Sequence, residues 1–196
     1  MGTRIHLAQI ERLFEKSPVV DFKSIARIIR SGKGKSRSNY AKLMVSNLLK
    51  KDKIHKVGKG YYSQHNESSL AVFGFQPAYL GLQSALSYYG LWEQETIPII
   101  LTTKKVRRGL RQVLGTNILV RNISRKYFFG FELAREESFY LPYSDLEKTL
   151  IDFVVFNEKI DDSVLKALAK RVDRDKLKKY LWRYPKKLRG RVEGVL

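Results

Sequence analysis

The sequence contains no cysteine among its 196 residues, which excludes disulfide bonds, cysteine-ligated zinc and thiol nucleophiles. It has no apolar run of about 18 residues, so no segment is expected to span a membrane. The first residues lack the continuous apolar stretch of a secretory signal peptide. Histidine occurs three times, at a spacing that suits no shared metal ion. We therefore expect a cytoplasmic protein with no metal, no cofactor and no membrane partner.

The chain is also poor in negative charge. It has 19 Asp and Glu against 38 Lys and Arg, so its formal net charge is +19. Residues 1–62 carry a net charge of +11, residues 63–160 a net +1 and residues 161–196 a net +7. A polyanionic partner is the simplest reason for this excess, and nucleic acid is favoured ahead of an anionic membrane surface.

The first sixty residues show three helical patterns followed by a short hairpin. Apolar residues recur at helical spacing over about residues 3–16, and Asp21 is a suitable N-cap for a second helix. A third helix is predicted from about residue 38 to 51, and two short strands flank Gly58-Lys-Gly60. One side of the third helix holds Tyr40, Leu43, Met44, Asn47 and Leu48. The layout predicts an α+β protein, with a winged helix-turn-helix at residues 1–63 and a mixed α/β C-terminal domain ending in helices.

A winged helix-turn-helix places its third helix in the major groove, with the N-terminal residues of that helix nearest the base edges. Arginine bridges guanine and asparagine bridges adenine, while lysines of the wing and of the preceding loop reach phosphates. A single lysine is better explained as a solvated surface charge. Together with the hairpin and the local charge, however, these residues favour binding to double-stranded DNA. The predicted DNA-binding residues are Lys33, Lys35, Arg37, Ser38, Asn39, Lys42, Lys56 and Lys59.

The basic loop at residues 31–38 is longer than the usual turn of about 3–4 residues between the second and third helices. Either the third helix begins early, near Ser36, or the loop is an extra phosphate-contacting element. Gly34-Lys-Ser36 also matches the end of a Walker A motif. That motif needs glycine where Ile29 stands and a strand where a helix is predicted, so no ATP site is expected.

Residues 64–77 are predicted to link the first module to a second domain over residues 78–196. The apolar run at 78–91 predicts a helix that ends near Gly90, since glycine is a favoured C-cap. Aspartates suited to N-capping open two further predicted helices, over about residues 161–172 and 173–182. The second domain therefore begins and ends with helices in this prediction.

Three segments of the second domain resemble the C-terminal domain of AbiEi-type antitoxins. They are Tyr79–Leu91, the strand Ile99–Thr102, and Leu146-Glu-Lys-Thr-Leu-Ile-Asp152. This family pairs such a domain with an N-terminal winged helix, and its members are transcriptional regulators of type IV toxin–antitoxin systems. The resemblance covers about residues 1–160. It implies a repressor of its own operon, usually at inverted repeats, and a cognate nucleotidyltransferase-type toxin. Inverted repeats would call for a dimer on the DNA, although the sequence shows no heptad or other dimer seam.

An enzymatic function would have to use Glu147, Lys148 and Asp152. Glu147 and Asp152 are five positions apart on a predicted helix and do not share a face. Ser144 and Glu147 match a capping box, which gives Glu147 a structural role, and Lys148 is expected to be solvated. No catalytic residue is therefore predicted, and the chain is not expected to be an enzyme.

Aromatic residues keep one alternative open. Tyr127-Phe-Phe129 follows Arg125 and Lys126, and aromatics among cations can stack on unpaired bases. Burial in the core is the favoured interpretation of these three rings. If it fails, an RNA-binding function for the central domain is the next interpretation. The alternative to a repressor for the whole chain is an RNA-binding adaptor or a nuclease-like protein that carries a winged-helix module.

Overall fold

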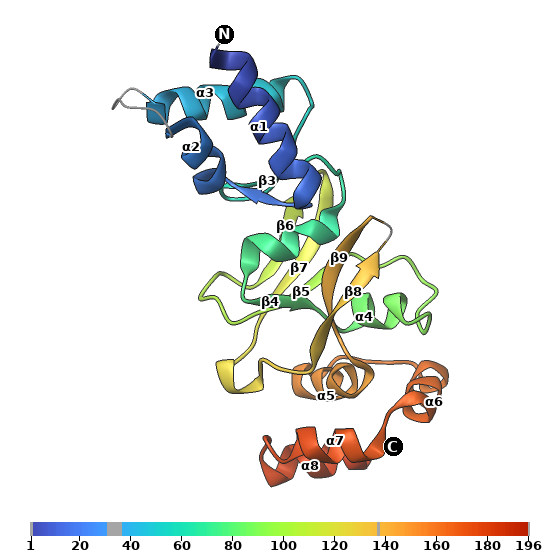
Figure 1. Ribbon diagram of the computed structural model, residues 1–196. Coiled ribbons are helices and arrows are strands. Elements are labelled where there is room, and N and C mark those ends of the chain that lie inside the picture. The colour runs from blue at the N-terminus through green and yellow to red at the C-terminus, as the bar shows by residue number, and fades with distance from the viewer. Residues whose placement is uncertain (1, 31–36, 137, 196) are drawn as a thin grey trace. The chain divides into compact units, whose positions relative to one another are not determined.

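The computed structural model describes residues 2–30, 37–136 and 138–195, apart from the side chains of residues 2–5, 30, 37 and 38. The chain forms two compact units (Figure 1). Met1–Gly74 and Gln112–Thr116 make up the first unit, and Phe75–Arg111 and Asn117–Leu196 make up the second. Both units combine helices with a sheet, so the predicted mixed α+β class is confirmed.

The first unit packs helices against a small antiparallel sheet of order β1-β3-β2. Its elements are α1 (Gly2–Lys16), β1 (Val20–Asp21), α2 (Phe22–Arg30), α3 (Arg37–Lys50), β2 (His55–Gly58) and β3 (Tyr61–Ser63). Each helix gives one apolar face to a shared core, which includes Ile10, Phe14, Ile25, Ile29, Ala41, Val45 and Leu48. The predicted helices and hairpin are confirmed, because their apolar spacing matches the helical period of these buried faces.

Helix α2 begins at the residue that the sequence indicates. The N–H of Ser24 donates to Asp21 Oδ1 at 2.6 Å, which satisfies one of the free N–H groups in the first turn. Burial alone would raise the pKa of Asp21, but the hydrogen bonds from Ser24 outweigh it and lower the pKa. Asp21 is therefore the predicted N-cap, held in its charged form.

The segment predicted as a linker, residues 64–77, is packed into the fold. It contains the 3-10 helix η1 (Ser68–Phe75), in which Leu70, Ala71 and Val72 are fully buried. Gly74 lies against β2, where a Cβ added to Gly58 would stand 3.3 Å from its Cα atom. The connection is thus a fixed part of the structure up to this point, because apolar side chains anchor it.

The second unit is built on a mixed six-stranded sheet of order β6-β7-β5-β4-β9-β8. Its strands are β4 (Ala78–Leu80), β5 (Ile99–Thr102), β6 (Gly109–Val113), β7 (Thr116–Asn122), β8 (Phe131–Glu136) and β9 (Phe139–Ser144). Its helices are α4 (Gln83–Tyr88), η2 (Arg125–Tyr127), α5 (Leu146–Phe156), α6 (Asp162–Arg171), α7 (Arg174–Leu181) and α8 (Lys186–Glu193). The predicted ending in helices is confirmed.

The helix predicted over residues 78–91 is wrong in its first part. Residues 78–80 form β4, which runs antiparallel to β5 and parallel to β9. Gly81 then packs so closely that an added Cβ would stand 2.7 Å from a side-chain carbon of Leu101. Leu82 follows with φ 55°, and only then does α4 begin. A short apolar run buried on all sides has no periodicity that separates a strand from a helix.

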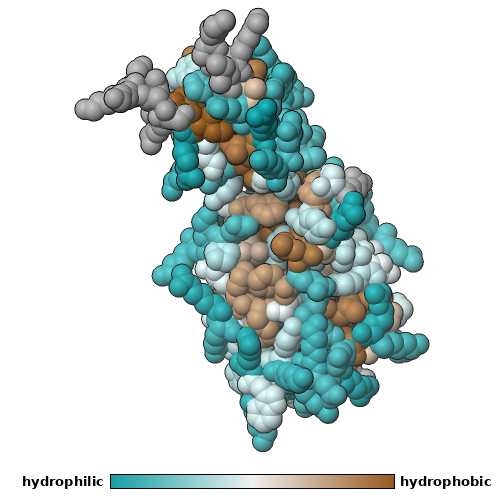
Figure 2. All heavy atoms as spheres, viewed as in Figure 1, coloured by the Kyte–Doolittle hydropathy of each residue, from teal (hydrophilic) through white to brown (hydrophobic). Residues whose placement is uncertain are grey.

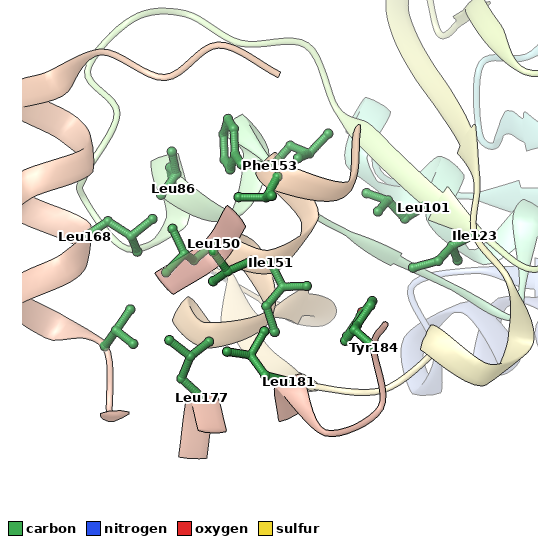
Figure 3. Packing of buried hydrophobic residues seen from close by; sticks show 14 of the residues in the cluster. Leu86, Leu101, Ile123, Leu150, Ile151, Phe153, Leu168, Leu177, Leu181 and Tyr184 are labelled. Carbon is green, nitrogen blue, oxygen red and sulfur yellow. The ribbon is translucent and has the colours of Figure 1, made fainter. Parts of the chain in front are cut away.

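The core of the second unit is centred on α5. Figure 3 shows Leu150, Ile151 and Phe153 of α5 pointing toward side chains from the surrounding elements. The partners labelled there include Leu86, Leu101, Ile123, Leu168, Leu177, Leu181 and Tyr184. Helices α6, α7 and α8 therefore belong to the same hydrophobic core as the sheet.

Helix α5 begins one residue later than the predicted capping box. Asp145 is the N-cap, and its Oδ1 accepts from the N–H of Lys148 at 2.7 Å. Ser144 instead places its hydroxyl oxygen 2.8 Å from that of Thr149. Serine and aspartate are both good N-caps and stand next to each other here, so spacing alone selects the wrong one.

The described residues contain neither a membrane span nor a metal cluster. No helix in this part of the chain is both long and apolar enough to cross a membrane. No group of three or more His, Asp or Glu among the same residues is arranged to hold a metal ion.

Candidate nucleic-acid interface

Helix α3 has a buried face and an outward face, and the outward face is the centre of the candidate interface. Ala41 and Val45 are buried against the core of the first unit. Asn39 and Lys42 lie on the exposed side, together with Leu43, of which 57% of the surface is accessible. An amide, an ammonium group and an apolar side chain on one helix face are the groups that read base edges in the major groove.

The side of α3 that the sequence pattern picks out is only partly buried. Of the five residues predicted to share it, Met44 and Leu48 are buried, whereas Leu43 and Asn47 are exposed. Asn39, Leu43 and Asn47 are spaced four residues apart and so follow one line along the helix. The exposure of Leu43 is not evident from the sequence, because a leucine at helical spacing is usually counted as core.

The β2–β3 hairpin supplies a second group of exposed cations. Lys56 lies in β2 opposite Tyr62 of β3, Lys59 lies in the turn, and both lysines are exposed. Gly60 follows with φ 78°, a conformation that favours glycine. Its carbonyl accepts a hydrogen bond of 2.8 Å from the N–H of Phe22. This bond ties the turn to the first residue of α2 and so fixes the position of Lys59 within the first unit.

Two acidic side chains of the first unit have basic partners outside the candidate site. Glu11 lies 3.9 Å from Lys53, and Asp52 lies 3.4 Å from His55. No described residue forms an ion pair with the exposed candidate lysines, which are Lys42, Lys56 and Lys59. Their positive charge is therefore available to phosphate groups.

The structure places the predicted site residues in three groups. Lys33 and Lys35 lie outside the described residues. Arg37 and Ser38 open α3, but their side chains lie outside the described atoms. The other four are exposed, and they are Asn39 and Lys42 on α3 and Lys56 and Lys59 on the hairpin.

The candidate catalytic set of the second unit is buried. Lys148 and Asp152, one helical turn apart on α5, form an ion pair between Nζ and Oδ1, and both are fully buried. The hydroxyl of Tyr79 on β4 donates to Asp152 Oδ2 at 2.7 Å. Burial raises the pKa of Asp152 and lowers the pKa of Lys148. Such groups can act as acids or bases, but neither has surface open to a substrate. The cluster joins β4 to α5, and the expectation that Lys148 is solvated is wrong.

Glu147 and Asp145 hold α7 against the start of α5. Glu147 Oε1 accepts from the N–H of Asp173 at 2.8 Å. Lys176 Nζ lies 2.9 Å from Glu147 Oε2 and 3.1 Å from Asp145 Oδ2, and the Tyr180 hydroxyl donates to Asp145 Oδ2 at 2.8 Å. Burial alone would lower the pKa of Lys176, but its bonds to the two carboxylates raise it. These contacts give Glu147 a structural role, through α7 rather than through a capping box.

The segment considered for base stacking is used for packing. Tyr127 stacks on Tyr184 with ring centroids 4.2 Å apart, and Phe129 meets Tyr180 edge-on at 5.0 Å. The rings of residues 127–129 all pack against the core of the second unit. The core interpretation of these aromatics is confirmed.

One exposed aromatic side chain, which the sequence motifs did not single out, does stand among cations. Trp182 follows α7 with 74% of its surface accessible. The guanidinium of Arg189 lies 4.8 Å from the centre of the indole ring. The sequence does indicate a basic surface around Trp182, because residues 176–192 contain eight Lys and Arg and no Asp or Glu.

Similarity to known proteins is confined to the fold. No protein-family model and no curated protein matches the sequence. Among solved structures, the chain is similar to the crystal structure of the RV2827C protein from Mycobacterium tuberculosis, with a TM-score of 0.59 and 15% sequence identity. The match covers 99% of this chain and 75% of that chain. At this level of identity the likeness extends to the fold alone.

Proposed function

We propose that this chain is a DNA-binding transcriptional repressor whose first unit is a winged helix-turn-helix module. The observation that carries the proposal is the outward face of α3, where Asn39, Lys42 and Leu43 are exposed. The same compact unit bears a hairpin with two exposed lysines. The order of its elements, helix, strand, two helices and hairpin, is the order of such a module.

Each exposed side chain has a distinct role in this proposal. Asn39 pairs with adenine, Leu43 contacts a thymine methyl group, and Lys42 contacts guanine or an adjoining phosphate. Lys56 and Lys59 contact phosphates from the wing and set the orientation of the module on the duplex. The further contacts expected at the N-terminal end of α3 come from Lys33, Lys35, Arg37 and Ser38.

The resemblance to AbiEi-type antitoxins extends the proposal to the second unit. The segments that carry the resemblance belong to one packed structure, because β4 pairs with β5 and Tyr79 of β4 bonds to Asp152 of α5. In this proposal the second unit is the antitoxin domain. The protein acts in the cytoplasm as a dimer, represses its own operon at inverted repeats and opposes a nucleotidyltransferase-type toxin.

Mobility-shift titrations with the DNA upstream of the gene test the repressor proposal. At physiological salt, the upstream duplex is expected to bind about a thousandfold more tightly than a scrambled duplex. Asn39→Ala is expected to reduce this preference about tenfold, because the amide that pairs with adenine is removed. Lys59→Ala is expected to weaken both duplexes alike. Equal affinity for the two duplexes would refute sequence-specific repression, and tighter binding to single-stranded RNA at α3 would favour the RNA-binding adaptor.

A further inference from the structure

The last two helices of the second unit form an unusually basic surface. Residues 176–192, which span most of α7 and α8, hold eight Lys and Arg and no Asp or Glu. Figure 2 shows mostly hydrophilic side chains at this end of the second unit, the lower end of the view. Both helices pack on α5 through apolar side chains, including Leu177, Leu181 and Val192. The cations are therefore carried by a fixed scaffold.

Six of the eight basic side chains of this region fall into two groups. Lys176 is used inside the unit, because it bonds to Asp145 and Glu147, and the guanidinium of Arg183 covers the ring of Phe129 at 4.3 Å. The other group is exposed and forms no ion pair with any described residue. Its members are Lys178, Lys179, Lys186 and Lys187. Four unpaired ammonium groups on neighbouring turns are suited to phosphates.

Trp182 stands among these lysines. Lys178 and Lys179 precede it by four and three positions at the end of α7, which places them beside it on the helical surface. Arg189 reaches its ring from α8, and Lys186 precedes Arg189 by one turn. Arg189 is itself held, because its Nε donates to the carbonyl of Tyr184 at 2.9 Å. The indole thus rests against a fixed cation and keeps 74% of its surface open.

We propose that this surface, Trp182 with Lys178, Lys179, Lys186 and Lys187, binds single-stranded nucleic acid. An unpaired base stacks on the indole of Trp182, and the phosphates of the same strand contact the lysines. Bases in a duplex already stack on each other and offer no free face to an indole, so lysines alone would serve duplex DNA. Acidic protein side chains would satisfy the lysines but would leave the indole without a flat partner. The combination of exposed ring and unpaired cations therefore favours a single strand.

Tryptophan fluorescence localises the binding, because the chain has two tryptophans, Trp92 and Trp182. Trp92→Phe leaves Trp182 as the single reporter, and Trp182→Phe leaves Trp92. A short oligouridylate is the probe, and a duplex DNA of equal length is the comparison. We expect the oligouridylate to quench the first variant strongly and the second little, and the duplex to quench neither. Both variants are also prepared with Lys42→Gln and Lys59→Gln, so that binding at the first unit does not mask the result.

Affinity measurements with labelled oligouridylate separate stacking from charge. Trp182→Ala is expected to weaken binding about tenfold, whereas Tyr140→Ala, which removes an aromatic side chain 56% exposed on β9, is expected to leave it unchanged. Lys186→Gln with Lys187→Gln should lower the slope of log affinity against log salt by about 0.7 for each phosphate that the variant no longer neutralises. Lys166→Gln with Lys170→Gln, exposed on α6, is the charge-matched control.

Three results would overturn the proposal. The first is an unchanged Trp182 signal while oligouridylate binds. The second is equal quenching by the duplex, which would assign the surface to double-stranded DNA. The third is unchanged affinity in a Trp182→Ala variant whose melting temperature matches that of the wild type. None of these results depends on the outcome for α3, so the two proposals can fail separately.

Discussion

Removing one partner of the buried ion pair in the second unit should cost a large share of the stability of that unit. Asp152→Ala leaves the ammonium of Lys148 fully buried without its ion-pair partner, near the rings of Tyr79 and Phe129, at 5.5 and 5.6 Å. Breaking a buried ion pair from one side typically costs about 3–5 kcal/mol, against a total stability of about 5–15 kcal/mol for a domain. The Tyr79 hydroxyl is also left without its acceptor, which destabilises the variant further.

Replacing both partners should behave differently. Lys148→Met with Asp152→Leu removes the buried charges, and such replacements are neutral or stabilising by about 1–4 kcal/mol. The unpaired Tyr79 hydroxyl costs about 1–3 kcal/mol and offsets much of that gain. The double variant is therefore expected to lie within about 2 kcal/mol of the wild type, far above the Asp152→Ala variant.

Urea unfolding followed by tryptophan fluorescence measures these differences. Both tryptophans lie in the second unit, so the signal reports the unfolding of that unit. If Asp152→Ala does not fold, Tyr79→Phe provides the comparison, with an expected loss of about 2 kcal/mol for one hydrogen bond to a charged group. A loss of less than about 1 kcal/mol in Asp152→Ala, or a double variant as unstable as the single one, would show that an unpaired buried charge is not what destabilises the unit.

Three further predictions concern the contacts around α5 and α7. Gly130→Ala should destabilise the second unit by about 2 kcal/mol or more. The φ angle of residue 130 is 68°, and the new Cβ would stand 2.8 Å from a ring carbon of Tyr180 and 2.9 Å from the Cβ of Lys148. Gly90 has φ 66° and open space around it. In the same urea titration, Gly90→Ala should therefore lose only the stability that alanine costs in this backbone conformation, without the cost of a steric clash. Asp145→Ala should lower the melting temperature more than Asp145→Asn, which keeps the cap; equal losses would contradict the capping role. Burial and the bond to Asp145 raise the pKa of Tyr180 from 10.0 to about 12. The folded pKa lies above the unfolded one, so this contribution is complete below pH 10 and is lost as pH rises toward 12. Between pH 10 and 12, the melting temperature of a Tyr180→Phe variant should therefore fall less than that of the wild type. Identical profiles of melting temperature against pH would contradict a contribution from Tyr180.

Much of the fold follows from local signals in the sequence. The helices near residues 3–16, 161–172 and 173–182 can be predicted because each has a polar cap or a regular apolar stripe. Asp173 does accept from the N–H groups of Asp175 and Lys176, and these bonds lower its pKa. Caps and stripes are properties of neighbours in sequence, so no tertiary information is needed to recognise them.

The errors arise where tertiary contacts decide. Residues 78–80 form a strand only because β5 and β9 flank them, and a single sequence does not show which strands will be neighbours. Lys148 is buried because Asp152 and Tyr79 meet it from two elements. Leu43 and Trp182 are exposed although both residue types usually count toward a core. For the candidate site, Asn39 and the lysines follow from the sequence, whereas the outward position of Leu43 depends on the packing of its neighbours.

In the proposed function, the outward face of α3 and the β2–β3 hairpin contact DNA. Amide chemical-shift mapping of the full chain with the upstream duplex would locate this contact residue by residue. We expect the largest shifts at residues 39–47 and 56–60, with little change at Arg12 and Glu15 on the exposed side of α1. Lys42→Gln with Lys59→Gln should abolish these shifts at the same duplex concentration. Shifts confined to other parts of the chain, or none at residues 39–47 while the duplex binds, would show that α3 does not contact the DNA.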